Sequence, residues 1–152
     1  MKGIDLKHYG SCHCGGVKIT SSDKPMIVVQ CNCQSCRKLT GSVSVSCLFD
    51  ETEIEFSGAT NVYQFEGGSG QSITVHFCKI CNSRSYYYFD VFEGLVIVPI
   101  GCFDNVKQLK PKLEIWTIEK LSWLEDNGCI QLRIADSGMQ ERLEAMLSKL
   151  SD

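Results

Sequence analysis

The chain has 152 residues, 43% hydrophobic and 22% charged, a balance typical of one globular domain with a buried core. The formal net charge of -3 argues against nucleic acid as a partner. No run approaches the ~18 consecutive apolar residues that cross a membrane. Residues 1–10 also lack the apolar stretch of a secretion signal, so we expect a cytoplasmic protein without a membrane partner.

Short strands are expected through most of the chain. β-branched, aromatic or alternating apolar and polar residues gather at 17–20, 26–29, 53–56, 72–77, 85–89 and 95–100. Glycine-containing turns at 57–58, 67–70 and 93–94 separate several of these segments. Strands at intervals of about ten residues, with no helical period between them, predict an antiparallel sandwich or barrel.

The C-terminal segment has a different pattern. After a turn signal at 126–128, Ser137 and Gln140 have the spacing of a helix capping box. Four apolar residues then share one helical face: Leu143, Met146, Leu147 and Leu150. We expect a short helix that docks on the sheet through this face. The alternative is a homodimer contact made by the same helix.

Seven of the ten cysteines lie in three clusters. Cytosolic thiols are kept reduced, so close cysteine spacings in such a chain favour metal binding over disulfides. Zinc accepts thiolates in a tetrahedral arrangement, with bonds of about 2.3 Å. The clusters are Cys12 with Cys14, the trio Cys31, Cys33 and Cys36, and Cys78 with Cys81.

The count of sulfurs predicts two zinc ions per chain. The two pairs adjoin predicted strands, and together they complete a closed four-sulfur structural site. The trio comes from six consecutive residues and leaves one position open, as catalytic zinc requires. The alternative is that both sites only hold loops together, with His13, His76 or another cysteine completing the second.

The remaining cysteines and histidines have simpler interpretations. Cys47, Cys102 and Cys129 stand alone in the sequence, and we expect each to be buried as a small apolar residue. His13 is expected to point to solvent. His76, within a strand, is expected to be a hydrogen-bonded sheet residue rather than a ligand.

The ordered motifs resemble the glutathione-dependent formaldehyde-activating enzyme family, which includes centromere protein V-like proteins. The resemblance extends over roughly residues 10–123. It is carried by GSCHCGGV at 10–17, CNCQSCRK at 31–38, Gly41-Ser42 and FCKIC at 77–81, and more loosely by GCFD at 101–104 and Ile115-Trp116.

The resemblance implies an Mss4-like fold, a zinc-binding β-sandwich of mainly antiparallel strands. It implies the same ligand division, with Cys12, Cys14, Cys78 and Cys81 structural and Cys31, Cys33 and Cys36 at the catalytic zinc. The implied activity is that of a carbon–sulfur lyase, joining glutathione and formaldehyde as S-hydroxymethylglutathione or reversing this step. We expect residues 1–127 to form this domain and residues 128–152 to be an extension within it.

Two local features depart from the family pattern. Asn82 follows the last cluster where the family usually has glycine, although asparagine tolerates the left-handed conformation. The run Tyr86-Tyr87-Tyr88 is unusually aromatic, so it either forms a pocket wall or packs within the sheet.

The expected substrate is a small-molecule thiol or thiol adduct, with glutathione as co-substrate. Because glutathione is anionic, basic residues near the clusters are candidates for binding it. They are Arg37, Lys38 and Arg84, with Lys79 beside the last cluster. No general acid is evident.

Two other classes of function fit the same cysteines. The first is a protein-binding module that zinc stabilises without catalysis. The second is a redox or metal-buffering protein, in which Cys33 and Cys36 form a disulfide under mild oxidant.

Overall fold

The structure is a computed structural model that describes residues 8–68 and 70–151, with side chains described to residue 144 and at residue 147. It contains two β-sheets. The smaller is antiparallel, in the order β1-β2-β5. Its strands are β1 (His8–Ser11), β2 (Lys18–Ser21) and β5 (Ile54–Ser57).

The larger sheet has eight strands in the order β11-β10-β3-β4-β9-β8-β7-β6. It is antiparallel from β3 to β6, whereas β10 pairs in parallel with both β3 and β11. The strands are β3 (Ile27–Cys31), β4 (Ser44–Asp50), β6 (Thr60–Glu66), β7 (Ser72–Cys78), β8 (Arg84–Phe89), β9 (Leu95–Pro99), β10 (Leu113–Ile115) and β11 (Leu132–Arg133).

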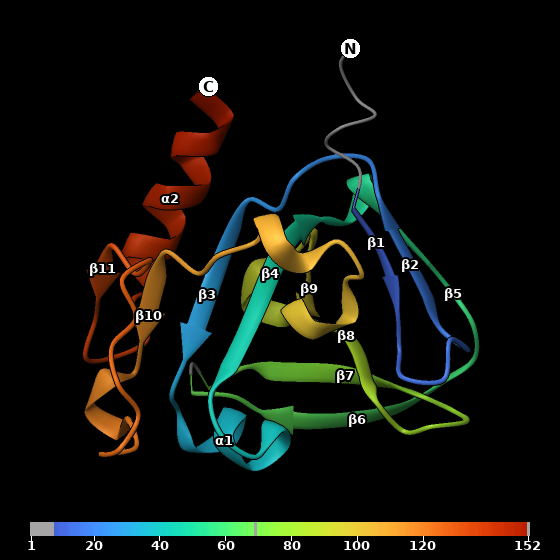
Figure 1. Cartoon of the computed structure of the whole chain (residues 1–152), viewed down its shortest axis with the longest axis horizontal. Coiled ribbons are helices and arrows are strands. Elements are labelled where there is room, and N and C mark those ends of the chain that lie inside the picture. The colour runs from blue at the N-terminus through green and yellow to red at the C-terminus, as the bar shows by residue number, and fades with distance from the viewer. Residues whose placement is uncertain (1–7, 69, 152) are drawn as a thin grey trace.

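In the described part of the chain, two α-helices accompany the sheets. Helix α1 (Gln34–Thr40) follows β3, and helix α2 (Met139–Ser151) follows β11. Figure 1 shows α2 beside β3 and β10 at one end of the molecule, with the three-stranded sheet at the other. Neither helix is long and apolar enough to cross a membrane.

The larger sheet has two buried faces, because apolar side chains alternate along its central strands. On β9, Val96 and Val98 join the core shared with the small sheet, while Ile97 joins the opposite core. Tyr86 and Tyr88 likewise pack on the small-sheet side, whereas Tyr87 lies on the other. The run of three tyrosines therefore serves both faces of the sheet.

The expected mainly β fold with a C-terminal helix is confirmed. All six expected strands are present, as β2, β3, β5, β7, β8 and β9, with bounds within two residues of those predicted. Helix α1 was not expected. The Cys33 sulfur accepts a hydrogen bond from the Cys36 amide at 3.3 Å, and Gly41 ends the helix at φ +95°. A thiolate side chain here takes the place of the usual oxygen cap.

The packing face predicted for the C-terminal helix is wrong where the side chains are described. Leu143 is 45% exposed and Leu147 63% exposed, whereas Arg142 is buried and Met139 packs against the core. Met146 and Leu150, which complete the predicted face, lie outside the described side chains. The homodimer contact through this helix stays a prediction.

The start of α2 explains the change of face. Gly138, not Ser137, occupies the capping position, because its carbonyl accepts the Arg142 amide at 2.9 Å. Gly138 has φ +56°, and a Cβ there would come within 2.9 Å of Ile115. This close approach and left-handed turn direct Met139 and Arg142 toward the sheet.

Candidate metal centres and the adjoining cavity

The first candidate metal centre joins the two distant cysteine pairs. The sulfurs of Cys12, Cys14, Cys78 and Cys81 all lie within 4.8 Å of one another. The Cys14 sulfur is 3.7 Å from those of Cys12 and Cys78. Tetrahedral zinc with 2.3 Å bonds places its sulfurs about 3.8 Å apart, so this donor set fits zinc. The separations are far too long for disulfides, and all ten cysteines are free.

Backbone amides orient these four sulfurs. The Val17 amide donates to the Cys12 sulfur at 3.2 Å, and the Gly16 amide donates to the Cys14 sulfur at 3.3 Å. On the other pair, the Ile80 amide donates to Cys78 at 3.4 Å. Such bonds stabilise thiolate charge, the form that binds metal.

The turn after Cys81 completes this centre. Asn82 adopts the left-handed conformation at φ 62°, as its tolerance of that region suggested. Ser83 lies beside the Cys81 sulfur at 3.1 Å, and its side-chain and backbone hydrogen bonds lower the pKa of Cys81 to about 5. Asparagine therefore makes this left-handed turn in place of the glycine that the resemblance led us to expect.

The second candidate centre is the trio of Cys31, Cys33 and Cys36, whose sulfurs also lie within 4.8 Å of one another. Cys31 ends β3, Cys33 caps α1, and Cys36 lies in the first helical turn. Among the described residues, no fourth cysteine, histidine or carboxylate joins this group. The donor set suits zinc with one open position.

The thiols of the trio share charge unevenly. Hydrogen bonds from Cys31 and Cys36 lower the pKa of Cys33 to about 3. The hydrogen bond to Cys33 in turn raises the pKa of Cys31 to about 12. Further deprotonation places like charges side by side, which a divalent cation offsets when it binds.

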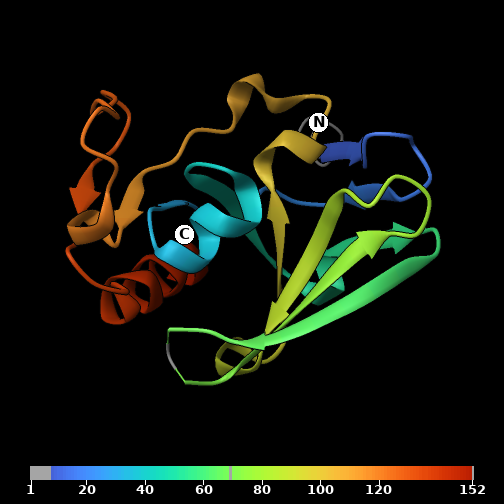
Figure 2. The ribbon, with the colours of Figure 1, turned by 90° about the horizontal axis from the view of Figure 1, so that it is seen from below.

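The trio borders a cavity of about 110 Å³ between the larger sheet and the two helices. Figure 2 shows α1 and α2 on the same side of the larger sheet, and residues from both line this cavity. No cysteine of the four-sulfur centre lines it. Cys12 and Cys78 instead belong to the core on the opposite face of the larger sheet. The two centres therefore occupy different environments.

A chain of hydroxyl groups borders the same cavity. The Tyr87 hydroxyl is 2.6 Å from that of Ser46, which is 3.2 Å from that of Ser44. Burial raises the pKa of Tyr87 to about 12, so its hydroxyl is protonated at neutral pH. The sequence left open whether the three tyrosines form a pocket wall or pack within the sheet, and it did not reveal this proton-bearing group.

The structure separates the predicted substrate-binding cations. Arg84 lines the cavity, with its guanidinium carbon 5.9 Å from the Tyr87 ring centroid. Arg37 is half-buried and Lys38 exposed, and both lie on α1 without lining the cavity. Lys79 is exposed beside the four-sulfur centre. A further cation, Arg142 of α2, lines the cavity and was not predicted.

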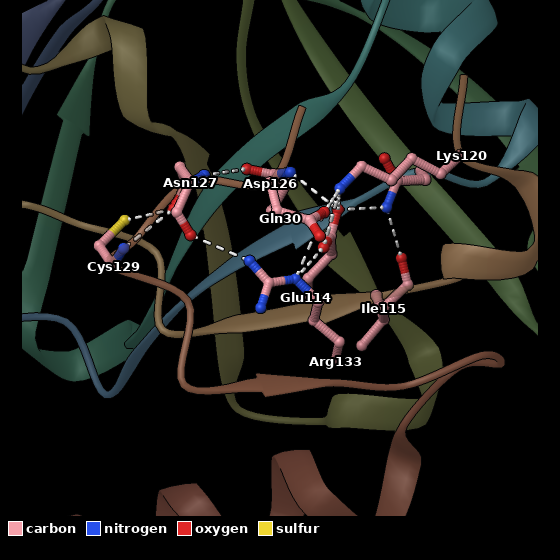
Figure 3. Close-up of polar contacts among 9 residues, drawn as sticks. Gln30, Glu114, Ile115, Lys120, Asp126, Asn127, Cys129 and Arg133 are labelled. Carbon is pink, nitrogen blue, oxygen red and sulfur yellow. Dashed lines mark hydrogen bonds and ion pairs between the residues drawn. The ribbon is translucent and has the colours of Figure 1, made fainter. Parts of the chain in front are cut away.

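A buried polar network underlies the trio (Figure 3). Glu114 of β10 has no exposed surface, yet its carboxylate accepts hydrogen bonds from Gln30 and Asn32, each at 2.9 Å. Lys120 and Arg133 pair with the same carboxylate at 3.2 and 3.1 Å. Sequence patterning gave no sign of this network, because its members are separated by up to about a hundred residues.

The predictions for isolated residues are confirmed with one exception. Cys47 and Cys102 are buried, and His13 is exposed. His76 Nδ1 lies 3.0 Å from the Thr60 hydroxyl, and its ring stacks on Tyr86. Cys129 contradicts the expectation, since it is only half-buried and donates to Asn127 Oδ1 at 2.8 Å. Its position in a polar turn, rather than a strand, explains the difference.

Fold and site define a mainly β protein with two cysteine centres suited to metal, one of them beside a cavity. The family model for the glutathione-dependent formaldehyde-activating enzyme matches residues 7–119. The chain belongs to this family.

A crystal structure of a Rhodobacter sphaeroides protein is similar to the chain at 21% identity, with a TM-score of 0.46. The match covers 70% of this chain and 92% of that one. No curated protein matches the chain.

Proposed function

We propose that this chain is a cytosolic zinc-dependent carbon–sulfur lyase acting on a glutathione-type thiol adduct. The reaction joins formaldehyde and glutathione as S-hydroxymethylglutathione, or takes a related adduct apart. The observation that carries the proposal is the three-sulfur centre at the wall of a cavity, with Tyr87 and two arginines on the same walls. Family membership supports the choice of substrate.

The two centres take different roles in this proposal. Cys12, Cys14, Cys78 and Cys81 hold a structural zinc that fixes β7 to the β1–β2 connection. Cys31, Cys33 and Cys36 hold the second zinc. When bound there, zinc supplies an open coordination position that stabilises an incoming sulfur as thiolate.

In the forward reaction the thiol sulfur forms a bond to the carbonyl carbon of formaldehyde. The carbonyl π electrons move to oxygen, and the proton lost from the thiol ends on that oxygen. The Tyr87 hydroxyl is placed to donate a hydrogen bond to this developing alkoxide, and Ser46 orients the hydroxyl from 2.6 Å. Aromatic and aliphatic side chains make up much of the cavity wall around this hydroxyl.

Cavity size limits which part of the substrate enters. One ordered water needs roughly 10–15 Å³ by the same measure, so about 110 Å³ holds on the order of eight water-sized groups. The cysteinyl sulfur and its one-carbon adduct fit this space. The rest of a tripeptide extends beyond it, and Arg84 is a candidate for binding its carboxylates.

The test is a rate measurement on the zinc-loaded full chain. Exchange NMR follows interconversion of glutathione, formaldehyde and S-hydroxymethylglutathione against the uncatalysed background. We expect acceleration that Cys33→Ser abolishes, while Cys129→Ser keeps it. Cys129 is the matched control because it lies in neither cysteine centre.

The same variants separate the lyase from a binding module stabilised by zinc. An enzyme loses turnover in Cys33→Ser while most of its thermal stability remains. A module loses melting temperature to the same degree at either centre. A wild-type rate equal to background, with both zinc ions bound, would exclude this substrate.

A further inference from the structure

The C-terminal segment brings a buried arginine to the cavity. Helix α2 lies beyond residues 7–119, the part of the chain that the family model matches. Met139 and Arg142 of this helix line the cavity together with all three cysteines of the trio. The extension therefore forms part of the site rather than a separate appendage.

The Arg142 side chain is fixed in place. Its residue is 8% exposed, and Nε and Nη2 both donate to the Ser137 carbonyl, at 3.0 and 2.8 Å. The guanidinium carbon lies 5.7 Å from the centroid of the Phe92 ring. These contacts pre-orient the planar group, so little side-chain entropy remains to be lost when a ligand binds.

The positive charge of Arg142 lacks a carboxylate partner. Among the described residues, no aspartate or glutamate lies within ion-pair distance of it. Its hydrogen bonds to Ser137 use Nε and Nη2, and Nη1 has no bond to a described residue. The anionic groups that act on it include the sulfurs of the trio, but no carboxylate of a described residue does, and an arginine fork matches a carboxylate in geometry.

We propose that Arg142 is the carboxylate-binding residue of the cavity and makes the site selective for anionic thiols. Its ligand is a carboxylate a few bonds from the sulfur that a zinc ion held by the trio would bind. This inference rests on the proposed function, because it places the reacting sulfur at Cys31, Cys33 and Cys36. The class of substrate is then a thiol that carries a carboxylate, from small thiol acids to glutathione, or its one-carbon adduct, with neutral thiols disfavoured.

The experiment compares two thiols of matched size, 3-mercaptopropanoate and 3-mercaptopropanamide. Calorimetry measures their dissociation constants on the zinc-loaded full chain. We expect the wild type to bind the carboxylate at least about tenfold more tightly than the amide. Arg142→Gln should lose that preference, and its affinity for the amide should stay within about twofold of the wild-type value. Arg142→Lys should retain part of the preference.

Lys38→Gln is the matched control, because Lys38 is an exposed cation near the trio in sequence that does not line the cavity. The Lys38→Gln variant should prefer 3-mercaptopropanoate over 3-mercaptopropanamide as strongly as the wild type does. Equal wild-type affinity for the two thiols overturns the inference and leaves the lyase proposal standing. A preference that persists in Arg142→Gln overturns it as well.

A structural role for Arg142 gives a different result. In that case Arg142→Gln weakens the binding of both thiols alike, or it lowers the zinc content while the preference for the carboxylate thiol persists. Either result means that the inference fails. If neither thiol binds the wild type, the proposed thiol chemistry fails, and propanoate and propanamide test Arg142 separately. If propanoate shifts the NMR resonances of cavity residues in the wild type but not in Arg142→Gln, the carboxylate site is supported. If propanoate causes no such shifts in the wild type, the inference is overturned.

Discussion

Asn32, the residue between Cys31 and Cys33, donates a 2.9 Å hydrogen bond to the fully buried carboxylate of Glu114. Its side chain also donates to the Ile115 carbonyl at 3.1 Å, and its backbone amide donates to the same oxygen at 3.2 Å. The segment carrying two sulfurs of the trio is thus held against β10. Such support fixes the direction of metal ligands without touching the metal.

Asn32→Ala should therefore weaken zinc binding at the trio while leaving the four-sulfur centre unchanged. Loss of the two side-chain hydrogen bonds frees the peptide units that join Asn32 to Cys31 and to Cys33. Loss of comparable supporting bonds costs roughly 10–100-fold in metal affinity. Competition with a chromophoric chelator measures the two zinc affinities separately.

Asn61→Ala provides the control, since Asn61 is an exposed residue of β6. We expect two zinc affinities equal to those of the wild type in that variant. An unchanged affinity at the trio in Asn32→Ala would show that the local turn into α1 positions these sulfurs without help from Glu114.

Glu114 should make stability depend on pH. Burial alone raises its pKa, but hydrogen bonds from Asn32 and Lys120 outweigh it and hold the pKa below the ordinary 4.5. A carboxyl with a depressed folded-state pKa stabilises the fold above its unfolded-state pKa. The unfolded chain takes up this proton first as pH falls, so the contribution diminishes below about pH 4.5 and is lost through the folded-state pKa.

The isosteric variant Glu114→Gln isolates this effect. At pH 7 we expect it to lower the free energy of unfolding by about 1–3 kcal/mol, because Lys120 and Arg133 lose their shared buried anion. Urea titrations at pH 7 and pH 4 measure the difference between wild type and variant. That difference should shrink at pH 4, whereas a constant difference would exclude the charge as its source. Acid release of zinc affects both proteins and largely cancels.

The sequence was most informative where spacing alone determines structure. The two cysteine pairs and the trio were assigned correctly to separate groups, because each cluster is local and thiolate number limits the combinations. Alternating residues placed six strands within two residues of their bounds. The first inference depends on local spacing and the number of thiolates, and the second on short-range periodicity, both of which a single sequence records directly.

Other parts of the site depend on contacts between distant segments. Tyr87 reaches the cavity while Tyr86 and Tyr88 face the other core, and only the register of β8 decides which side each takes. Arg142 was missed because the apolar stripe of α2 suggested a neighbouring face, which includes the exposed Leu143 and Leu147. The turn at Gly138 overrides that stripe, and nothing in the helical period reveals it.

The zinc proposed for the four-sulfur centre should stabilise the whole sandwich. The four-sulfur centre links Cys12 and Cys14 to Cys78 and Cys81 across more than sixty intervening residues. We expect Cys78→Ser to cost about 3 kcal/mol or more, which lowers the melting temperature by roughly 10 °C. Cys47→Ser, a buried cysteine outside both centres, is the matched control and should cost less. Equal losses in the two variants would show that burial, not metal, accounts for the effect.

Tyr87→Phe should reduce turnover and leave thiol binding intact. The substitution removes the hydroxyl that Ser46 orients from 2.6 Å and keeps the ring that lines the cavity. Loss of one donor to a developing oxyanion costs roughly 10²–10³-fold in kcat. Exchange NMR gives the rate, and calorimetry with glutathione gives the affinity, which should change by less than about threefold.

Tyr88→Phe is the matched comparison. Tyr88 directly follows Tyr87 in the sequence, but it packs on the other face of the larger sheet, in the core shared with the small sheet. It should keep wild-type turnover. Because burial raises the pKa of Tyr87 to about 12, the wild-type rate should show no loss from tyrosine ionisation up to about pH 10. Equal rates in Tyr87→Phe and wild type would remove Tyr87 from the mechanism. The oxyanion would then depend on a donor other than this hydroxyl, and Ser44 and Ser46 would be the next residues to replace.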